Sequence, residues 1–361
     1  MKWGFLSLGY GTYDAESPYK ELLGGTQSSL IFLMEHLSSL GENITFWNEG
    51  IINSNLKGIK HLNINFNNLE KINDEDIDIL IFIGRSDAIP SIKKYLKKNI
   101  PLIFWAHHSY DQEPMQELKD QENIKNLSAI IFVSSWQELS VIGHLKLHNI
   151  KTIVIENGIS PPFENLFEDL KEFKDKKREL IGCYASTPFR GLEELLKSSI
   201  FINYPMKIKI FSSMKIYNMP DHNYEELYNQ LKKSDKFIYY GSINKQELAL
   251  EFKSSSFLTY PSTFQETFCI TLIDSLAAGM RPILTDLGAL KETSNGFASF
   301  LIKKKISFHE DYANLINEEI NIKQNNYDLW CENRFNQIKI VNEKYNYKNI
   351  AQKWINIIKN L

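Results

Sequence analysis

The sequence has little cysteine, no long apolar run and almost no net charge. Cys183, Cys269 and Cys331 are an odd and scattered set, which argues for a reducing compartment and against a disulfide framework or a zinc site. No apolar run approaches the ~20 residues of a membrane span, and the glycine-broken start, MKWGFLSLGYG, is too short for a signal peptide. A net charge of −3 gives no argument for nucleic acid as a partner. These absences indicate a cytoplasmic protein.

The 361 residues exceed what one ordinary core supports, so two domains are expected. Apolar residues make up 43% of the chain, as in globular proteins. Short apolar runs alternate with amphipathic stretches, a pattern typical of parallel sheets covered by helices on both faces. One series of strands is expected at 2–9, 43–48, 77–84, 101–107, 129–135 and 151–157, and another at 180–186, 206–213, 236–242, 256–262 and 281–286.

The composition changes after NGISPPFEN (157–165), where a charged run separates the two series of strands. We therefore expect an α/β protein with one Rossmann-like domain over 1–160, a second over 161–335, and a cleft between them. Ligands of such sheets bind beyond the carboxyl ends of the strands. The remaining segment, 336–361, ends in a helix with one apolar face, and we expect it to return to the first domain.

Two acids, Glu266 and Asp274, stand eight residues apart at the ends of an apolar run within 262–286. At about 1.5 Å of helical rise per residue they would lie roughly 12 Å apart. That is too far for two acids acting on one bond, but it suits the two ends of an elongated ligand. The helix between them would expose its first amides around 268–271, a site for an anion. Sugar hydroxyls, a diphosphate and a ribose fit that order; the alternative is two solvated acids.

The neighbouring residues repeat a known pattern. Gly241 ends a strand, Pro261-Ser262 precede Glu266, a helix ends at Ala277-Ala278-Gly279, and Gly288 begins a G-x-x-x-E loop. Residues 237–296 thereby resemble the donor half of GT-B glycosyltransferases, specifically the large retaining family four with its E-x7-E element. The sequence departs from that element at its second acid, which is Asp274. The resemblance implies that Glu266 faces the donor sugar and that Asp274 faces the ribose.

The first half of the chain is similar to the same family. Gly24 and Gly25 precede a helix at the place where the family's backbone approaches the donor phosphate, and His107 ends a strand where the family often keeps a histidine facing the sugar. Gly9 and Gly11 imitate a dinucleotide fingerprint. The third glycine is missing and a long loop precedes the helix, which disfavours NAD.

The loop after the first strand of the second domain departs further from the family. In CYASTPFRGLEELL, Arg190 and Gly191 match a Lys-Gly pair that grips the diphosphate, whereas the family's earlier cation is replaced by Ala185, Ser186 or Thr187. Arg190 can bind a diphosphate bidentately. The loss of one cation reduces the electrostatic help available to the leaving group.

The resemblance implies a retaining, metal-independent transfer of a hexose from a UDP- or GDP-linked sugar to a hydroxyl of a glycan or lipid acceptor, without a cofactor. Glu266, His107 and Arg190 are the expected catalytic residues. The alternatives are a GT-B epimerase or phosphorylase, or a catalytically weak GT-B subunit that binds sugar nucleotide or a partner. The expected substrate-binding residues are Gly24, Gly25, Ser186, Gly241, Ser242, Thr267, Phe268, Cys269, Ile270, Thr271 and Asp274.

Two further charged segments carry weaker indications. The acids of DEDID (74–78) resemble a metal-binding DxD motif but precede a strand instead of ending one, so solvated acids are expected. The segment 91–100 places Lys93, Lys94, Lys97 and Lys98 beside apolar residues. Such a helix suits peripheral contact with an anionic membrane, although a solvated helix face is the more ordinary interpretation.

Overall fold

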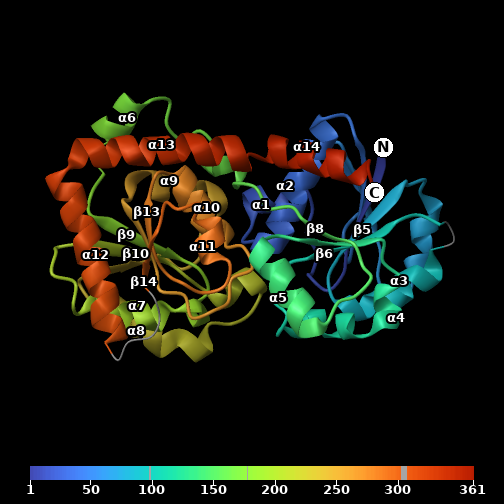
Figure 1. The fold of residues 1–361 in the computed structure, drawn as a ribbon, viewed down its shortest axis with the longest axis horizontal. Helices are drawn as coiled ribbons and strands as arrows, with labels where there is room; N and C mark the ends of the chain where they lie inside the picture. The colour runs from blue at the N-terminus through green and yellow to red at the C-terminus, as the bar shows by residue number, and fades with distance from the viewer. Residues whose placement is uncertain (97–98, 177, 302–306) are drawn as a thin grey trace. The chain divides into compact units, whose positions relative to one another are not determined.

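The computed structural model describes residues 1–96, 99–176, 178–301 and 307–361. Contacts divide the chain into two compact units, each with its own sheet (Figure 1). The expected α/β architecture is confirmed. The main part of the second unit begins at Gly158. The C-terminal segment that belongs to the first unit begins at Tyr347, whereas the sequence predicted that it begins at residue 336. The first unit comprises Met1–Pro18, Gly25–Asn157 and Tyr347–Leu361, and the second comprises Tyr19–Gly24 and Gly158–Asn346.

The sheet of the first unit has the strand order β3-β4-β2-β1-β5-β6-β7-β8. Neighbouring strands are parallel, except that β3 runs antiparallel to β4. Strand order reverses between β1 and β5, as in doubly wound sheets. The strands are β1 (Lys2–Ser7), β2 (Asn43–Asn48), β3 (Ser54–Leu56), β4 (Ile59–Asn63), β5 (Ile79–Ile83), β6 (Leu102–Ala106), β7 (Ala129–Phe132) and β8 (Thr152–Val154).

The β3–β4 hairpin was not expected from the sequence. Leu56 pairs with Ile59, so the turn consists of Lys57 and Gly58 alone. Their φ angles are 51° and 75°, and a two-residue turn with positive φ at both positions matches the twist of the flanking strands. Glycine adopts this conformation readily, but lysine rarely does, so the sequence carries only half of the usual turn signal.

Helices pack on the sheet of the first unit, and the last helix of the chain is one of them. Helix α14 packs against α2, where the rings of Tyr347 and Phe32 lie 5.5 Å apart. Trp354 is fully buried with its ring 4.9 Å from that of Trp105 on β6. The C-terminal helix therefore returns to the first unit, as expected. The helices are α1 (Ser17–Lys20), α2 (Gly25–Ser39), α3 (Ile89–Tyr95), α4 (Gln121–Ile124), α5 (Ser135–Leu145) and α14 (Tyr347–Ile358).

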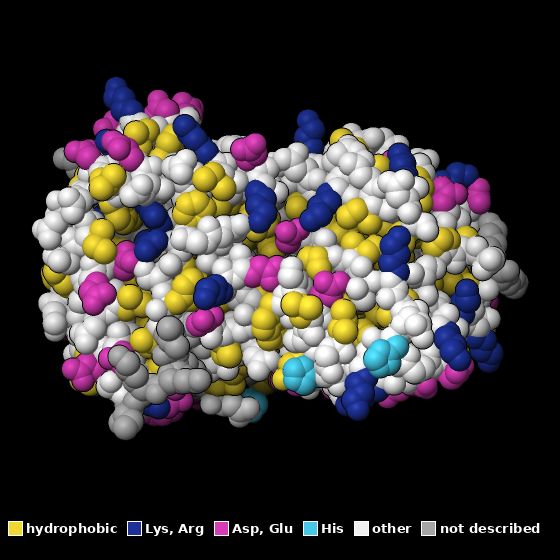
Figure 2. Space-filling view, in the orientation of Figure 1, with side chains coloured by type: hydrophobic (Ala, Val, Ile, Leu, Met, Phe, Trp, Pro, Cys, Tyr) yellow, Lys and Arg dark blue, Asp and Glu magenta, His cyan; other side chains and the backbone are white. Residues whose placement is uncertain are grey.

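The charged segments of this unit have ordinary surroundings. Asp76 forms an ion pair with Lys2 at 2.5 Å, and Asp78 accepts a hydrogen bond from the Lys2 amide. Both acids therefore bind the first residue of β1. Within 91–100, α3 ends at Tyr95, and Lys97 and Lys98 lie outside the described residues. Basic and acidic side chains are interspersed on the face drawn in Figure 2. None of the described helices is long and apolar enough to span a membrane.

The sheet of the second unit has six parallel strands in the order β11-β10-β9-β12-β13-β14. The chain winds outward from β9 in one direction and from β12 in the other, so the order reverses between these two neighbours. Ligands of open α/β sheets bind at such a switch point. The strands are β9 (Ile181–Ala185), β10 (Lys207–Phe211), β11 (Phe237–Tyr239), β12 (Phe257–Tyr260), β13 (Arg281–Thr285) and β14 (Ser299–Leu301).

Figure 1 shows α7 and α8 on one face of this sheet, and α9 and α10 on the other. Helix α13 packs against α10, and its buried Gln337 donates hydrogen bonds to the carbonyls of Leu276 and Met280 at 2.8 and 3.0 Å. These bonds satisfy backbone groups at the end of α10. The helices are α6 (Leu170–Asp175), α7 (Leu192–Ser199), α8 (Glu225–Lys233), α9 (Lys245–Ser254), α10 (Ile270–Ala277), α11 (Leu290–Thr293), α12 (Phe308–Asn325) and α13 (Tyr327–Tyr345).

Gly191 allows the loops after β9 and β12 to meet at the switch point. Its φ is 110°, and a Cβ at this position would lie 2.2 Å from the carbonyl oxygen of Pro261, well inside van der Waals contact. The Thr263 hydroxyl also donates to the Phe189 carbonyl at 3.2 Å. Only glycine permits this close approach of the two backbones.

Replacing Gly191 with alanine should separate the two loops. We expect Gly191→Ala to lower the free energy of unfolding by about 3 kcal/mol, because a backbone clash adds to the strain of a positive φ. Gly296 is the matched control, since its φ is 78° and a Cβ there would meet nothing within 4 Å. Gly296→Ala should cost only about 1 kcal/mol. Urea denaturation measures both, and equal losses would show that the close approach is unimportant.

Candidate functional site

The candidate site lies at the switch point of the second sheet, beyond the carboxyl ends of β9 and β12. The loop after β9 carries Arg190 on a single 3₁₀ turn, Pro188–Arg190, and the loop after β12 carries Glu266. Although 76 residues separate them in sequence, the two side chains are in contact. The structure thus brings together two of the three residues expected to be catalytic.

Arg190 and Glu266 form a buried ion pair. Nη1 of Arg190 donates to both carboxylate oxygens of Glu266, at 2.9 and 3.0 Å, and Glu266 is only 4% exposed. Burial alone would lower the pKa of Arg190, but the Glu266 carboxylate holds that pKa well above its usual range. The guanidinium is therefore charged, and the pair is a fixed dipole in a poorly solvated place.

Tyr260, the last residue of β12, adds a third hydrogen bond to this carboxylate. Its hydroxyl donates to Oε1 of Glu266 at 2.5 Å and lies 3.3 Å from the hydroxyl of Ser186. Burial, with the Glu266 charge second, raises the pKa of Tyr260 well above its ordinary value, so the phenol keeps its proton. Ser186, one of the expected substrate-binding residues, thereby belongs to the same cluster.

The backbone of Glu266 is also fixed. Glu266 and Gly288 form an isolated parallel bridge, and the Ala289 amide donates to the Glu266 carbonyl at 2.7 Å. A Cβ on Gly288 would lie 2.5 Å from that carbonyl oxygen, and the φ of Gly288 is 65°. The glycine of the G-x-x-x-E loop is therefore required where the strand ends of β12 and β13 converge.

Aromatic rings surround the guanidinium of Arg190. It lies 4.2 Å from the ring centroid of Phe264 and 5.5 Å from that of Phe189, distances suited to cation–π attraction. Nη2 donates to the Tyr217 hydroxyl at 3.3 Å. The direction of the side chain is thus set by its neighbours and not by the carboxylate alone.

Helix α10 begins four residues after Glu266. Cys269 precedes it with a φ of 65°, and Ile270 and Thr271 open its first turn. Burial, with the Glu266 charge second, raises the pKa of the Cys269 thiol well above its ordinary value, so the thiol is neutral. The amides expected to bind an anion, those of 268–271, follow Glu266 in the chain with only Thr267 between them. Phe268, the first of these residues, is buried. Because the helix starts only at Ile270, the helical spacing expected between the two acids does not apply.

The second acid, Asp274, is fully buried inside the second unit. Its carboxylate accepts from the amide and the hydroxyl of Ser160 at 2.8 and 2.9 Å, and forms an ion pair with Lys245 at 2.8 Å. It is therefore not a solvated helix residue. In this structure it ties α10 to the segment that follows residue 157 and to the start of α9, and its contact with a ribose remains a prediction.

The other expected substrate-binding residues lie elsewhere. Gly241 and Ser242 are half-buried in the loop between β11 and α9, four and three residues before Lys245. Gly24 ends the segment Tyr19–Gly24, which clusters with the second unit, and Gly25 begins α2 in the first unit.

His107 follows β6 of the first unit. Its ring lies 4.6 Å from that of Trp105, and burial, with the neighbouring His108 second, lowers its pKa to about 3. The imidazole is therefore neutral at ordinary pH, with one nitrogen as donor and the other as acceptor. That state suits hydrogen bonding to a sugar hydroxyl.

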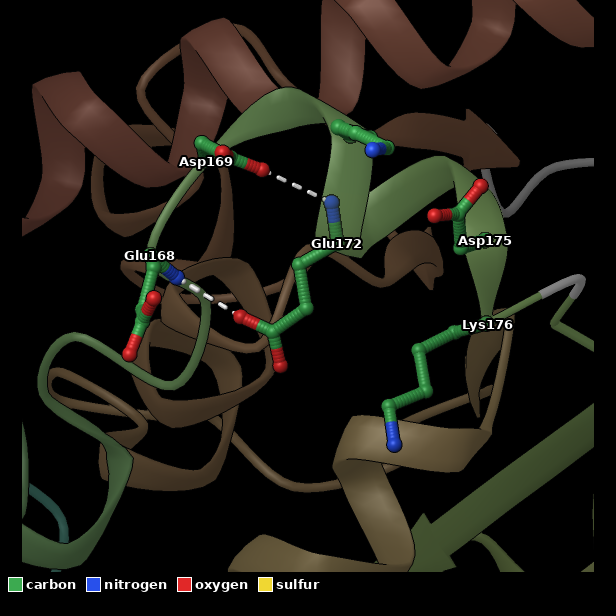
Figure 3. A pocket seen from close by; sticks show the side chains of 6 residues that line it. Glu168, Asp169, Glu172, Asp175 and Lys176 are labelled. Carbon is green, nitrogen blue, oxygen red and sulfur yellow. Dashed lines mark hydrogen bonds between the residues drawn. The ribbon is translucent and has the colours of Figure 1, made fainter.

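A hollow on α6 is not a candidate site, because its carboxylates bind backbone amides at the start of the helix (Figure 3). The Asp169 carboxylate accepts from the Glu172 amide, and Glu172 accepts from the Glu168 amide, both at 2.8 Å. These bonds cap the start of the helix. The hollow is lined by Glu168, Asp169, Lys171, Glu172, Asp175 and Lys176.

Three contributing residues were missed in the sequence: Tyr260, Tyr217 and Lys245. Lys245 is the first residue of α9, where a cation opposes the helix dipole, and this unusual position was a readable signal. Tyr260 places a hydroxyl at the end of an otherwise apolar strand, which is a weaker signal. Tyr217 follows β10 and carried none.

Comparisons with known proteins bear on the fold and on part of the second unit. Residues 220–332 match the family model described as glycosyl transferases group 1. The chain is similar over 100% of both chains to HepE of Anabaena in complex with UDP-glucose, at 14% identity and a TM-score of 0.75. It is also similar to a glycosyltransferase from Rickettsia africae, at 17% identity, a TM-score of 0.76, and coverage of 99% of this chain and 98% of the other.

A third similar structure is the sucrose-phosphate synthase of Thermosynechococcus elongatus, at 13% identity and a TM-score of 0.73, covering 100% of this chain and 99% of that one. The fold is that of the GT-B glycosyltransferases. At these identities the likeness shows the GT-B fold alone. No curated protein sequence matches the chain. The matched segment 220–332 contains Glu266, Asp274 and Lys245, whereas Arg190 and His107 lie outside it.

Because the folded state keeps His107 neutral, the free energy of unfolding should fall as the pH is lowered. The folded state keeps His107 neutral down to a pH of about 3, whereas the unfolded chain protonates it below about 6.5. Between these values the unfolded state binds one more proton, so stability falls with falling pH by up to about 1.4 kcal/mol per pH unit. In urea denaturation from pH 7 to 5, His107→Gln should show a shallower fall than wild type. The exposed His148 is the control, and an unchanged slope in His107→Gln would contradict the burial of a neutral ring.

Proposed function

We propose that the chain is a nucleotide-sugar-dependent glycosyltransferase that moves a hexose, with retention of configuration, to an acceptor hydroxyl of a glycan or lipid. The observation that carries the proposal is the meeting of Arg190 and Glu266 at the switch point of the second sheet. Support comes from the match of 220–332 to glycosyl transferases group 1 and from the UDP-glucose bound by HepE, a protein of the same fold.

In this proposal Glu266 accepts a hydrogen bond from a hydroxyl of the donor sugar. For His107, which belongs to the first unit, contact with a sugar stays a prediction from the sequence. The bond between the anomeric carbon and the diphosphate oxygen breaks, a bond from that carbon to the acceptor oxygen forms, and the proton of the acceptor hydroxyl passes to the departing diphosphate, which leaves as the nucleoside diphosphate. Fixed groups such as the Glu266 carboxylate favour the charge that develops at the sugar, because they need not reorganise during the reaction.

Arg190 and the first amides of α10 hold the diphosphate. Nη1 of Arg190 is occupied by Glu266, but Nη2 has one N–H beyond its bond to Tyr217, and the buried Nε–H has no hydrogen-bond partner among the described residues. Nε and Nη2 form one edge of the planar guanidinium, the edge that binds phosphate bidentately. The proposal therefore lets Arg190 join the sugar-binding acid to the leaving group without a metal ion.

The ribose is assigned to the neighbourhood of Asp274. Its carboxylate already accepts three hydrogen bonds from Ser160 and Lys245, so the more accessible Lys245, whose side chain is 17% exposed, would meet the ribose as well.

A catalytically weak GT-B subunit is the second candidate. The observation in its favour is that Glu266 neutralises Arg190, which lowers the positive charge available to a diphosphate. Such a subunit would bind sugar nucleotide without turning it over.

If the acceptor of the glycosyltransferase is a lipid, the proposal includes a peripheral membrane contact through 91–100.

Glu266→Gln separates an enzyme from a binding subunit. We expect turnover to fall about a hundredfold or more, because the amide cannot replace the charge, while affinity for the nucleotide is kept or rises, because Glu266 no longer neutralises Arg190. The measurement is hydrolysis of a panel of UDP- and GDP-linked sugars, with affinity for UDP and GDP by calorimetry. A ligand at 100 times its Kd should also stabilise the protein by about 2.7 kcal/mol in thermal shift.

Two variants serve as references for that experiment. Glu247→Gln removes an exposed carboxylate on α9 and should change neither quantity. Asp274→Asn should mainly weaken nucleotide binding. Nucleotide binding by wild type without turnover of any sugar would favour the subunit, and an absence of nucleotide binding would overturn the proposal altogether.

Arg190→Ala tests the assignment of the diphosphate. A charge-assisted hydrogen bond contributes about 1.5–3 kcal/mol, so the affinity for UDP or GDP should fall about tenfold to a hundredfold. Affinity for uridine or guanosine should hardly change. Arg190→Lys should recover only part of the loss, because a point charge replaces a two-pronged donor. Equal losses for nucleoside and diphosphate, measured by calorimetry, would make Arg190 a structural partner of Glu266 only.

A further inference from the structure

We infer that Tyr260 is a positioning residue for the donor sugar: its hydroxyl holds the Glu266 carboxylate in one orientation, so that Oε2 is the oxygen that meets the sugar. This inference rests on the proposed function and deepens it. Nothing in the E-x7-E pattern or in the family match assigns a role to the residue at the end of β12.

The hydrogen bonds of the carboxylate are unequal. Oε1 accepts from Tyr260 at 2.5 Å and from Arg190 at 2.9 Å, whereas Oε2 accepts only from Arg190, at 3.0 Å, among the described residues. Each carboxylate oxygen has about two lone-pair sites. Oε1 is therefore saturated by the protein, and Oε2 keeps one site for a ligand hydroxyl.

Arg190 cannot create this inequality. Its single Nη1 lies 2.9 and 3.0 Å from the two oxygens, so it contacts both oxygen positions almost equally. The final torsion of a glutamate is broad, so the plane of the carboxylate needs a further contact to fix it. Tyr260 alone among the described contacts of the carboxylate distinguishes Oε1 from Oε2.

The hydroxyl of Tyr260 is well placed to act as a fixed donor. Its residue is 2% exposed, its ring packs 5.5 Å from that of Tyr184, and Pro261 limits the backbone that follows. The phenol keeps its proton at ordinary pH, because burial and the Glu266 charge oppose ionisation and raise its pKa. A buried hydroxyl is unfavourable without a partner, so a tyrosine here is explained by its bond to Glu266 and not by packing, which phenylalanine would supply.

Tyr260→Phe tests the inference, because it removes one oxygen and keeps the ring. With the sugar nucleotide that wild type hydrolyses best, we expect kcat to fall about tenfold or more while KM stays within about twofold. Tyr13→Phe is the control: Tyr13, in the first unit, is also buried, and its hydroxyl donates to the Ser7 hydroxyl at 2.6 Å. That variant should keep both constants.

A second measurement follows the hydrogen bond without any activity. The short bond to Glu266 should give a strongly downfield hydroxyl proton in the NMR spectrum. That proton should be present in wild type and in Tyr13→Phe, and absent from Tyr260→Phe and Glu266→Gln. If Tyr260→Phe keeps the wild-type kcat, or if the proton survives in Glu266→Gln, the inference is overturned. If wild type binds UDP-glucose but turns over no sugar nucleotide, the proposed function fails. The inference then requires Tyr260→Phe to lower the affinity for UDP-glucose more than the affinity for UDP. Equal losses of the two affinities would overturn the inference too.

Discussion

The second unit depends on a largely buried ion pair between the loops that follow two neighbouring parallel strands, β9 and β12. A salt bridge out of water is of little net benefit on its own, but removing one partner leaves an uncompensated charge, which is strongly destabilising. Arg190 and Glu266 therefore hold the ends of β9 and β12 at a fixed distance. Gly191 and Gly288 allow the backbones to approach closely enough for this contact, and the strand end of β13 joins through the bridge to Glu266.

A second acid–base pair stabilises the unit away from that point. Lys245 stands at the positive end of α9, where it opposes the helix dipole, and the buried Asp274 offsets it. Ser160 completes the arrangement with two hydrogen bonds to the same carboxylate. Local rules are broken at sites where something else compensates, often for function. Glu266 and Asp274 thus share one arrangement: each is buried, and each has its own cation.

Much of the fold could be predicted because parallel strands leave a direct signal in apolar runs. Every strand expected from the sequence is present, and α10 ends one residue before Ala278, with Gly279 at positive φ. The β3–β4 hairpin was missed because Lys57 has the φ of a glycine. The motifs singled out Glu266, Arg190 and Asp274, but they did not indicate which side chains contact these residues. The contact of Arg190 with Glu266 depends on strand order, which single motifs do not contain, and the hydroxyl of Tyr260 is hidden in an apolar strand.

The return of the last helix to the first unit has a consequence for synthesis on the ribosome. Domains ordinarily fold as units, with the N-terminal one first. Here the first unit needs Tyr347 and Trp354 to cover Phe32 and Trp105, and these two residues follow the whole of the second unit in the chain. Until α14 has been made, the first unit exposes apolar side chains of α2 and β6. Its N-terminal position therefore does not allow the first unit to complete its core before the second unit has been synthesised.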